Sequence, residues 1–224
     1  MSEVKARTLR VLIGDDHRIV REGLKQILAE ASEVQVVAEA PSGPEVLAQV
    51  AALRAGPGLD LVLLDIALPG LDGLDVLQTL KREHPKLPVL MLSTYPEKQY
   101  AVRCIRLGAS GYLNKSADPD DMLAAVRKVA DGGVFLTPTT AEALAAAVGQ
   151  GAAQAGPEAL SHREHQVYRL LTQGQTVSEI GAQLGLAPNT VSTYRARILE
   201  KTGTKNDVEL ALYAERHART RPAG

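Results

Sequence analysis

The residues of this sequence with the clearest chemical potential are four groups of polar side chains, each directly after a short apolar run. They are Asp15-Asp16, Asp65, Ser93-Thr94 and Lys115. If the apolar runs are parallel strands, the four groups meet at one edge of a sheet, because ligands of open α/β sheets bind outside the carboxyl ends of the strands. A single aspartate at a strand end is more often a turn former or a helix cap. Four polar groups at matching ends favour a common site instead.

Such a site would gather three carboxylates around one lysine and one hydroxyl group. Carboxylates within ~4 Å of one another repel by several kcal/mol at an effective dielectric near 20, so the cluster must share protons or bind a cation. Ligation by oxygen alone favours Mg²⁺. A divalent cation and a lysine around one carboxylate are the groups that phosphoryl transfer requires. We therefore predict that Asp65 is a nucleophile that forms an aspartyl-phosphate.

Apolar runs that alternate with helical patterns would position these groups. The spacing of apolar residues predicts strands over residues 9–14, 34–38, 61–64, 88–92 and 111–114, with a helix after each strand and the last helix over 122–130. Four apolar residues in a row at 61–64 are typical of a strand that is buried on both faces. The alternation predicts an α/β fold with a doubly wound, five-stranded parallel sheet of flavodoxin-like type.

The composition and the predicted secondary structure of the sequence change after the fifth predicted helix. Residues 139–148 are rich in alanine and predict a short helix, and residues 149–157 have the Gly, Ala and Gln content of a flexible linker. Beyond them every pattern is helical, and capping boxes begin at Ser161 and Thr176. Helix, short glycine-containing turn and helix within four helices predict an all-α helix-turn-helix domain. We expect domains at 1–133 and 158–224, joined by a linker at 134–157 that contains the short helix.

Composition sets limits on the class of protein. The 224 residues suffice for two small domains, and the formal net charge is −1. Residues 1–155 carry 16 Lys and Arg against 19 Asp and Glu, whereas residues 156–224 carry 9 against 7, a balance too slight to establish nucleic-acid binding. The one cysteine, Cys104, has the spacing of a packing residue and cannot form an internal disulfide. With no apolar run near ~20 residues, a cytoplasmic protein without a membrane partner is expected.

The helix predicted to start at Pro188 and to end before Gly203 has two distinct faces on a helical wheel. Its polar, partly basic face suits the major groove, where Asn, Ser and Thr bond base edges or phosphates and Arg and Lys bond phosphates. The same face would also suit a helix that is simply solvated. The candidate DNA contacts are Asn189, Thr190, Ser192, Thr193, Ala196, Arg197 and Lys201.

The polar groups and their flanking motifs resemble the receiver domain of bacterial two-component response regulators. The likeness is carried by Asp15-Asp16, by residues 63–73 (LLDIALPGLDG), by Leu92-Ser93 and by residues 108–115 (GASGYLNK). It implies that Asp65 accepts phosphate from a partner histidine kinase and that Lys115 contacts the phosphoryl oxygens. It further implies that Asp16, Asp65 and the carbonyl group of Ala67 bind Mg²⁺ with Asp15 acting through water, that Ser93 is the switch hydroxyl and that Tyr112 is the switch aromatic residue. Ser116 stands where many receivers have a proline held cis, so we expect a trans peptide there.

The C-terminal motifs resemble the LuxR-type domain of the NarL/FixJ regulators. Residues 160–164 (LSHRE) and 189–201 (NTVSTYRARILEK) carry this likeness. It implies binding to double-stranded promoter DNA as a homodimer, often through the last helix, here 207–216, with phosphorylation promoting the dimer. Ala187 stands at the N-cap where that family usually has Ser or Thr, and Arg195 lies on the core side of the wheel, where an internal acid is its expected partner.

We therefore predict a transcription regulator that phosphorylation controls and that is no enzyme beyond accepting a phosphoryl group on Asp65. A phosphatase is one alternative, but it would usually need an acid two residues after the nucleophile, where this chain has Ala67. A helical domain that binds protein or RNA is a second alternative, which a salt titration of duplex-DNA binding would test. A ligand-sensing regulator is a third, and it would leave the acidic cluster without use.

Overall fold

The structure is a computed structural model that describes residues 8–56, 58–94, 97–148, 160 and 162–219. The chain forms two compact units, residues 1–151 and 152–224, and each is described by itself. The predicted linker at 149–157 and the predicted capping residue Ser161 lie outside the described residues. The bounds of the domains remain a prediction.

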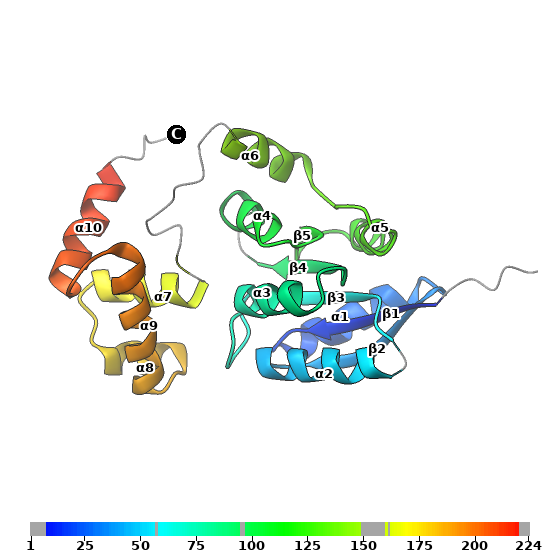
Figure 1. The fold of residues 1–224 in the computed structure, drawn as a ribbon, viewed down its shortest axis with the longest axis horizontal. Helices are drawn as coiled ribbons and strands as arrows, with labels where there is room; N and C mark the ends of the chain where they lie inside the picture. The colour runs from blue at the N-terminus through cyan, green and yellow to red at the C-terminus, as the bar shows by residue number, and fades with distance from the viewer. Residues whose placement is uncertain (1–7, 57, 95–96, 149–159, 161, 220–224) are drawn as a thin grey trace, which may run out of the picture. The chain divides into compact units, whose positions relative to one another are not determined.

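A five-stranded parallel sheet forms the centre of the first unit (Figure 1). Its strand order is β2-β1-β3-β4-β5, the order of a flavodoxin-like sheet, so the predicted topology is confirmed. All five residues of β3 are buried, as the apolar run at 61–64 predicted. The strands are β1 (Leu9–Gly14), β2 (Val34–Ala40), β3 (Leu61–Asp65), β4 (Val89–Ser93) and β5 (Gly111–Asn114).

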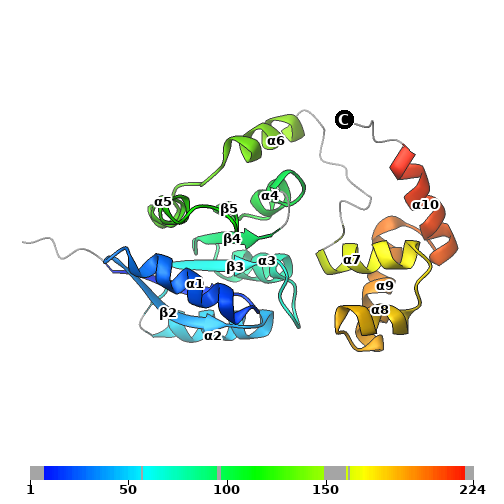
Figure 2. The same cartoon turned by 180° about the vertical axis from the view of Figure 1, so that it is seen from behind.

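Helices cover both faces of this sheet (Figure 2). Alternate residues of β3 point to opposite faces, so Leu61 and Leu63 belong to one apolar cluster and Val62 and Leu64 to another. The first cluster includes residues of α1 (Arg18–Ala29) and α5 (Pro119–Ala130). The second includes residues of α2 (Gly43–Ala55), α3 (Gly73–Glu83) and α4 (Glu97–Arg106).

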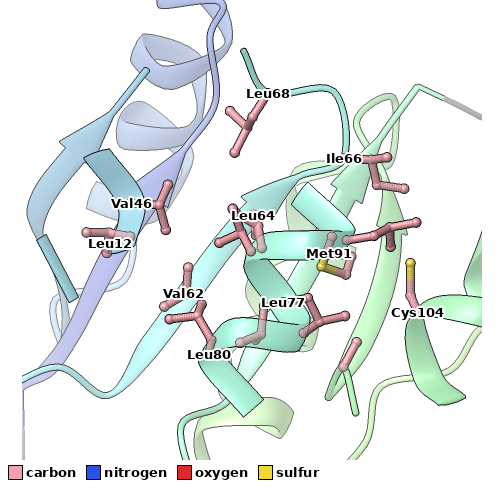
Figure 3. Close-up of a cluster of buried hydrophobic side chains, with 14 of the residues drawn as sticks. Leu12, Val46, Val62, Leu64, Ile66, Leu68, Leu77, Leu80, Met91 and Cys104 are labelled. Atoms are coloured by element: carbon pink, nitrogen blue, oxygen red, sulfur yellow. The ribbon is translucent and has the colours of Figure 1, made fainter. Parts of the chain in front are cut away.

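Figure 3 shows part of the second cluster, in which Cys104 packs on the same side of the sheet as Met91 and Leu77. Cys104 is fully buried, and burial raises the pKa of its thiol to about 12. The prediction that this cysteine is a packing residue is confirmed.

The segment after α5 covers the edge of the sheet. The Phe135 amide donates to the carbonyl oxygen of Ser110 at 2.9 Å, and Phe135 forms a parallel bridge with Gly111 of the edge strand β5. The alanine-rich helix α6 (Pro138–Val148) forms as expected, and it packs against α4 within the first unit. The predicted short helix therefore lies in the first unit, within the stretch 134–157 predicted as the linker.

The described residues of the second unit form four helices around a small apolar core. Thr176 and Glu179 make the predicted capping box, and Gly185, with φ +66°, ends α8 and begins the turn into α9. Helix, turn and helix are thus present as predicted. Ala187 is the N-cap of α9 and makes no side-chain capping bond. The helices are α7 (His162–Thr172), α8 (Val177–Leu184), α9 (Pro188–Thr202) and α10 (Asp207–Arg219).

None of the described helices is both long enough and apolar enough to cross a membrane.

Candidate functional site

The register of the sheet brings the predicted polar groups to one edge. Gly14 pairs with Leu64, Asp65 pairs with Leu92, and Ser93 pairs with Asn114. The residues that follow these pairs therefore leave the sheet at the same level, above the carboxyl ends of β1, β3, β4 and β5. This is where open α/β sheets bind their ligands.

Lys115 joins two of the predicted carboxylates. Its Nζ lies 2.8 Å from Asp65 Oδ2 and 2.6 Å from Asp15 Oδ2. The contact with Asp15 is a close ion pair rather than a well-directed hydrogen bond, because Asp15 Oδ2 has no hydrogen-bond partner of acceptable geometry. All three side chains are deep in the protein, with 10% of Lys115, 3% of Asp65 and 1% of Asp15 exposed.

Asp16 completes an acidic cluster at the rim. One carboxylate oxygen each from Asp15, Asp16 and Asp65, together with a ring nitrogen of His17, lie within 4.8 Å of one another. Asp15 Oδ1 accepts the His17 amide at 2.9 Å, and His17 Nδ1 lies 2.6 Å from Asp16 Oδ1. Three carboxylates against the one ammonium group of Lys115 leave an excess of two formal negative charges among these four groups. The residues present therefore fit a hard divalent cation with oxygen ligands, as Mg²⁺ is.

Burial and charge shift the pKa values of this pocket in defined directions. Burial raises the pKa of Asp65, and the attraction of Lys115 and a bond from the Ala67 amide offset this only in part. Burial alone would lower the pKa of Lys115, but the attraction of Asp65 and Asp15 outweighs it and raises that pKa. Lys115 is thus held as a cation beside a carboxylate that is costly to ionise.

The two predicted switch residues lie on neighbouring strands. Ser93 is fully buried at the carboxyl end of β4, and its carbonyl oxygen accepts the Lys115 amide at 2.9 Å. Tyr112 is fully buried in β5, on the face of the sheet that α4 covers. The Lys115–Ser116 peptide is trans, as serine at 116 led us to expect. Lys115 and Ser93 are therefore joined through the main chain.

The buried and exposed residues of α9 lie on the two faces that the helical wheel predicted. Val191 and Ile198 are buried in the core of the unit, and Tyr194 and Leu199 pack against it. All seven predicted DNA contacts are exposed: Asn189, Thr190, Ser192, Thr193, Ala196, Arg197 and Lys201.

Comparison with known proteins assigns a family to each of the two parts of the chain. Residues 11–127 match the family model of the response regulator receiver domain, and residues 158–214 match that of bacterial regulatory proteins of the luxR family. The response regulator GacA of Pseudomonas viridiflava is 39% identical over 210 residues, which cover 93% of this chain and 96% of that protein. The chain is a response regulator with a LuxR-type DNA-binding domain. The transcriptional regulatory protein UhpA of Salmonella typhimurium is 40% identical over 203 residues, covering 91% and 96%.

Solved structures agree with the fold of this response regulator. RcsB of Salmonella enterica serovar Typhimurium, solved bound to a promoter with the phosphomimetic BeF₃⁻, is 25% identical with a TM-score of 0.58. The alignment covers 93% of this chain and 98% of RcsB. The response regulator ChrA of a heme-sensing two-component system is 32% identical with a TM-score of 0.51, covering 94% and 98%.

Two ion pairs join α9 to its neighbouring helices in this response regulator. Arg195 Nε donates to Asp207 of α10 at 2.8 and 3.0 Å, so Arg195 has the acidic partner that its place on the wheel predicted. Lys201 Nζ donates to Glu164 Oε2 of α7 at 2.6 Å, and only 2% of the Glu164 side chain is exposed. Thr193 Oγ1 donates to the Asn189 carbonyl oxygen at 3.0 Å. Two of the predicted contacts, Lys201 and Thr193, are thus also engaged within the domain.

Three residues of the sequence motifs have structural roles that the sequence analysis did not predict. Asp72 is 1% exposed, and its Oδ1 accepts the Leu74 amide at 2.9 Å, which caps α3. Gly73 donates its amide to the Ile66 carbonyl oxygen at 2.9 Å, directly after Asp65. Glu164, the third, stands in the predicted Ser161 capping motif and accepts a bond from Lys201 Nζ. The Asp-Gly pair before an amphipathic helix was a usable signal for the cap, whereas nothing in the spacing of Glu164 points to Lys201.

The raised pKa of Asp65 leads to a prediction about the stability of this response regulator. Because the folded pKa lies above the ordinary value of 3.8, ionised Asp65 costs stability at neutral pH, and this cost disappears as the pH falls through the folded pKa toward 3.8. We expect Asp65→Asn to unfold at a higher temperature than the wild type at pH 7 in EDTA, with the difference shrinking toward pH 4. Thermal denaturation as a function of pH measures this. An Asp65→Asn variant that unfolds below the wild type at pH 7 would contradict it.

Proposed function

We propose that Asp65 accepts a phosphoryl group from the phosphohistidine of a sensor kinase and that this controls dimerisation and sequence-specific DNA binding by α9. The observation that supports this most directly is Lys115, which lies 2.8 Å from Asp65 and 2.6 Å from Asp15 at the carboxyl edge of the sheet. A carboxylate with a held cation beside it can both attack phosphorus and tolerate the charge that the product carries.

In this proposal one Asp65 oxygen forms a bond to phosphorus while the bond from phosphorus to the histidine nitrogen breaks. The imidazole leaves with the electron pair of that bond. Lys115, kept protonated by its two carboxylate neighbours, contacts the phosphoryl oxygens and offsets their charge. Mg²⁺, held by Asp16, Asp65 and the Ala67 carbonyl group with Asp15 acting through water, supplies further charge neutralisation when bound.

The product changes the charge of the pocket. Replacing one carboxylate by an acyl phosphate adds acceptor oxygens and brings the group to nearly two negative charges. Ser93 and Lys115, which are joined through the Ser93 carbonyl oxygen and the Lys115 amide, are proposed to move toward it together. Tyr112 and the surface of α4, β5 and α5 would follow this movement. The switch is proposed to serve a regulator in the cytoplasm.

The exposed face of α9 is proposed to enter the major groove of promoter DNA. Its polar residues suit base edges, and Arg197 and Lys201 suit phosphates. The partner of each copy is proposed to be a second copy, joined through α10, because Val208 and Leu212 stand one turn apart on that helix and are 71% and 53% exposed. RcsB, to which this chain is similar, was solved on a promoter, which supports the proposal for DNA.

One experiment tests the phosphoryl acceptor and the switch together. The full chain is incubated with Mg²⁺ and acetyl phosphate, and the modified residue is located by mass spectrometry. Binding to a random-sequence duplex library is then measured with and without the phosphoryl donor. We expect modification at Asp65, none in Asp65→Ala, and DNA binding that is about 10-fold tighter in the phosphorylated state, a usual size for allosteric coupling. Equal affinity in both states would remove the switch, and modification elsewhere would remove Asp65 as acceptor.

Lys201 gives a prediction about DNA contacts. If Lys201 contacts a phosphate while Glu164 anchors it, Lys201→Ala should reduce the slope of log affinity against log salt by about 1. Glu164→Gln should leave that slope unchanged, because the ammonium group remains. Lys201→Ala should unfold more easily, by about 1–3 kcal/mol, because the buried Glu164 carboxylate loses this charge-assisted bond. Glu164→Gln should lose less, because the glutamine oxygen can still accept from Lys201. A Lys201→Ala variant with the wild-type salt slope would assign Lys201 to packing alone.

The proposed dimer face gives a separate prediction. Leu212→Glu places a charge on the exposed apolar face of α10, so the phosphorylated protein should sediment as a monomer where the wild type is a dimer. Analytical ultracentrifugation measures this, with Glu215→Gln, at an exposed position of the same helix, as the matched control. A Leu212→Glu variant that still dimerises when phosphorylated would move the interface away from α10.

A further inference from the structure

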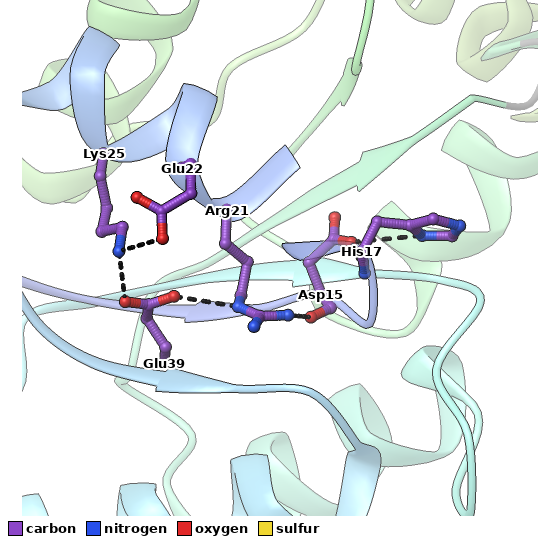
Figure 4. Close-up of polar contacts among 6 residues, drawn as sticks. All are labelled: Asp15, His17, Arg21, Glu22, Lys25 and Glu39. Carbon is purple, nitrogen blue, oxygen red and sulfur yellow. Dashed lines mark hydrogen bonds and ion pairs between the residues drawn. The ribbon is translucent and has the colours of Figure 1, made fainter. Parts of the chain in front are cut away.

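Arg21, one turn into α1, contacts the main chain of the acidic turn at the end of β1 (Figure 4). Its Nη1 donates to the Asp15 carbonyl oxygen at 2.7 Å, and its own amide donates to the His17 carbonyl oxygen at 3.1 Å. Its Nε donates to Glu39 Oε2 near the end of β2 at 2.9 Å. Only 14% of the Arg21 side chain is exposed. The guanidinium group therefore bridges β2 and the peptide that joins Asp15 to Asp16.

Glu39 is itself held from its other side. Its Oε1 accepts a bond from Lys25 Nζ at 2.7 Å, and Lys25 Nζ also donates to Glu22 Oε1 at 2.9 Å (Figure 4). The bonds to Glu39 and Glu22 raise the pKa of Lys25, and the bonds from Lys25 and Arg21 lower the pKa of Glu39 despite some burial. Glu22, Lys25, Glu39 and Arg21 thus form a row of side chains with alternating charge, and the row ends on the Asp15 carbonyl oxygen.

This row is better suited to orienting the turn than to stabilising the fold. Its outer ion pairs are partly exposed, and such pairs contribute little to stability. Other bonds hold other parts of the turn, since the Asp15 amide donates to the Ala40 carbonyl oxygen at 3.0 Å and Asp15 Oδ1 accepts the His17 amide. Arg21 holds the carbonyl side of the peptide between Asp15 and Asp16. The planar, rigid fork of an arginine can bond a carbonyl oxygen and a carboxylate at once in fixed geometry, which a lysine cannot.

We propose that Arg21, held by Glu39, is a positioning residue of the phosphoryl-accepting pocket. By fixing the peptide between Asp15 and Asp16 it fixes the direction in which the exposed Asp16 carboxylate meets Mg²⁺. This inference rests on the proposed function of the pocket and adds to it a residue that touches neither metal nor phosphoryl group.

The test compares Mg²⁺ affinity with stability in the full chain. We expect Arg21→Ala to raise the Mg²⁺ dissociation constant about 10-fold, the low end of what groups that orient metal ligands contribute. Titration calorimetry with Mg²⁺ alone measures the dissociation constant, and thermal denaturation in EDTA measures stability. The rate of modification by acetyl phosphate at subsaturating Mg²⁺ should fall in proportion to the occupied fraction, and it should recover at saturating Mg²⁺.

Arg127→Ala is the matched control. Arg127 Nε also donates to a glutamate on the same domain, Glu33 Oε1, at 2.8 Å, but Glu33 precedes β2 at the opposite end of that strand from Glu39. We expect Arg127→Ala to keep the wild-type dissociation constant for Mg²⁺. An Arg21→Ala dissociation constant within twofold of the wild type, or an equal change in both variants, would overturn the proposal.

Arg21→Lys keeps the test decisive if Arg21→Ala does not fold. An ammonium group lacks the rigid fork of the guanidinium group and would hold the two partners in a less fixed geometry, so the Mg²⁺ dissociation constant of Arg21→Lys should lie above that of the wild type. If Arg21→Lys and Glu39→Ala both bound Mg²⁺ with the wild-type dissociation constant, the proposal would be overturned. If the wild type itself neither binds Mg²⁺ nor accepts phosphate at Asp65, the function proposed for the pocket fails, which is distinct from a failure of Arg21 alone.

Discussion

Gly73→Ala is expected to lower the free energy of unfolding of the receiver domain by roughly 3 kcal/mol, the upper end of what overpacking usually costs. A Cβ on Gly73 would overlap the carbonyl oxygen of Asp65 and lie 2.9 Å from Ile66 Cα. Both neighbours are main chain, so no side-chain rotation relieves the contact. The start of α3 would have to move away from β3, which breaks the bond from the Gly73 amide to the Ile66 carbonyl oxygen. Urea denaturation measures the loss.

The same movement should displace Asp65, because the overlap is with its own carbonyl group. We therefore expect Gly73→Ala to be modified by acetyl phosphate more slowly than the wild type, even under conditions where it is folded. Gly23→Ala is the control. Gly23 lies within α1, and a Cβ there meets no atom within 4 Å, so alanine should raise stability by about 0.5–1 kcal/mol. Equal stabilities for Gly73→Ala and the wild type would contradict the close packing of α3 on the acceptor strand.

Lys115→Met is expected to have the second large effect, and its direction depends on Mg²⁺. Removing the ammonium group leaves Asp15 and Asp65 buried without their cation, which in EDTA should cost roughly 3 kcal/mol, as for other broken buried ion pairs. Without that cation the pocket is more negative, so it should bind Mg²⁺ more tightly than the wild type does. Added Mg²⁺ should therefore raise the unfolding temperature of Lys115→Met more than that of the wild type.

Lys115→Met should nevertheless lose the response of DNA binding to the phosphoryl donor, because the group proposed to follow the phosphoryl oxygens is gone. Arg127→Met serves as the control, since Arg127 also bonds a carboxylate, that of Glu33, but does so at the surface, and little change in stability is expected. If Lys115→Met matched the wild type in EDTA, or gained no more from Mg²⁺ than the wild type, the ion pairs would not be holding the pocket together.

The sequence determined the fold of the receiver and the place of its pocket. Five apolar runs with helical patterns between them allow a parallel sheet and little else, since each strand must be covered on both faces. Asp65 and Lys115 follow strands in that pattern, and parallel strands present their carboxyl ends at one edge. Their convergence could therefore be predicted although 50 residues separate them in the chain.

The sequence also determined the faces of α9. Successive residues of a regular helix point about 100° apart around its axis. The order of residues therefore assigns Val191 and Ile198 to the core, and Asn189 and Arg197 to the surface. The acidic partner of Arg195 followed from the same geometry, although its identity as Asp207 did not.

Only the tertiary structure decided which groups touch. The spacing of residues along a strand or helix says where a side chain points, but it does not say what a distant element places opposite. The sequence therefore did not indicate that Glu164 binds Lys201 or that Arg21 binds the Asp15 carbonyl group. Nor did it indicate that Gly73 lies against the main chain that follows β3. Lys115 reaches Asp15 as well as Asp65 because β1 and β5 flank β3 and β4 at the same level, a distance that the packing of the sheet sets.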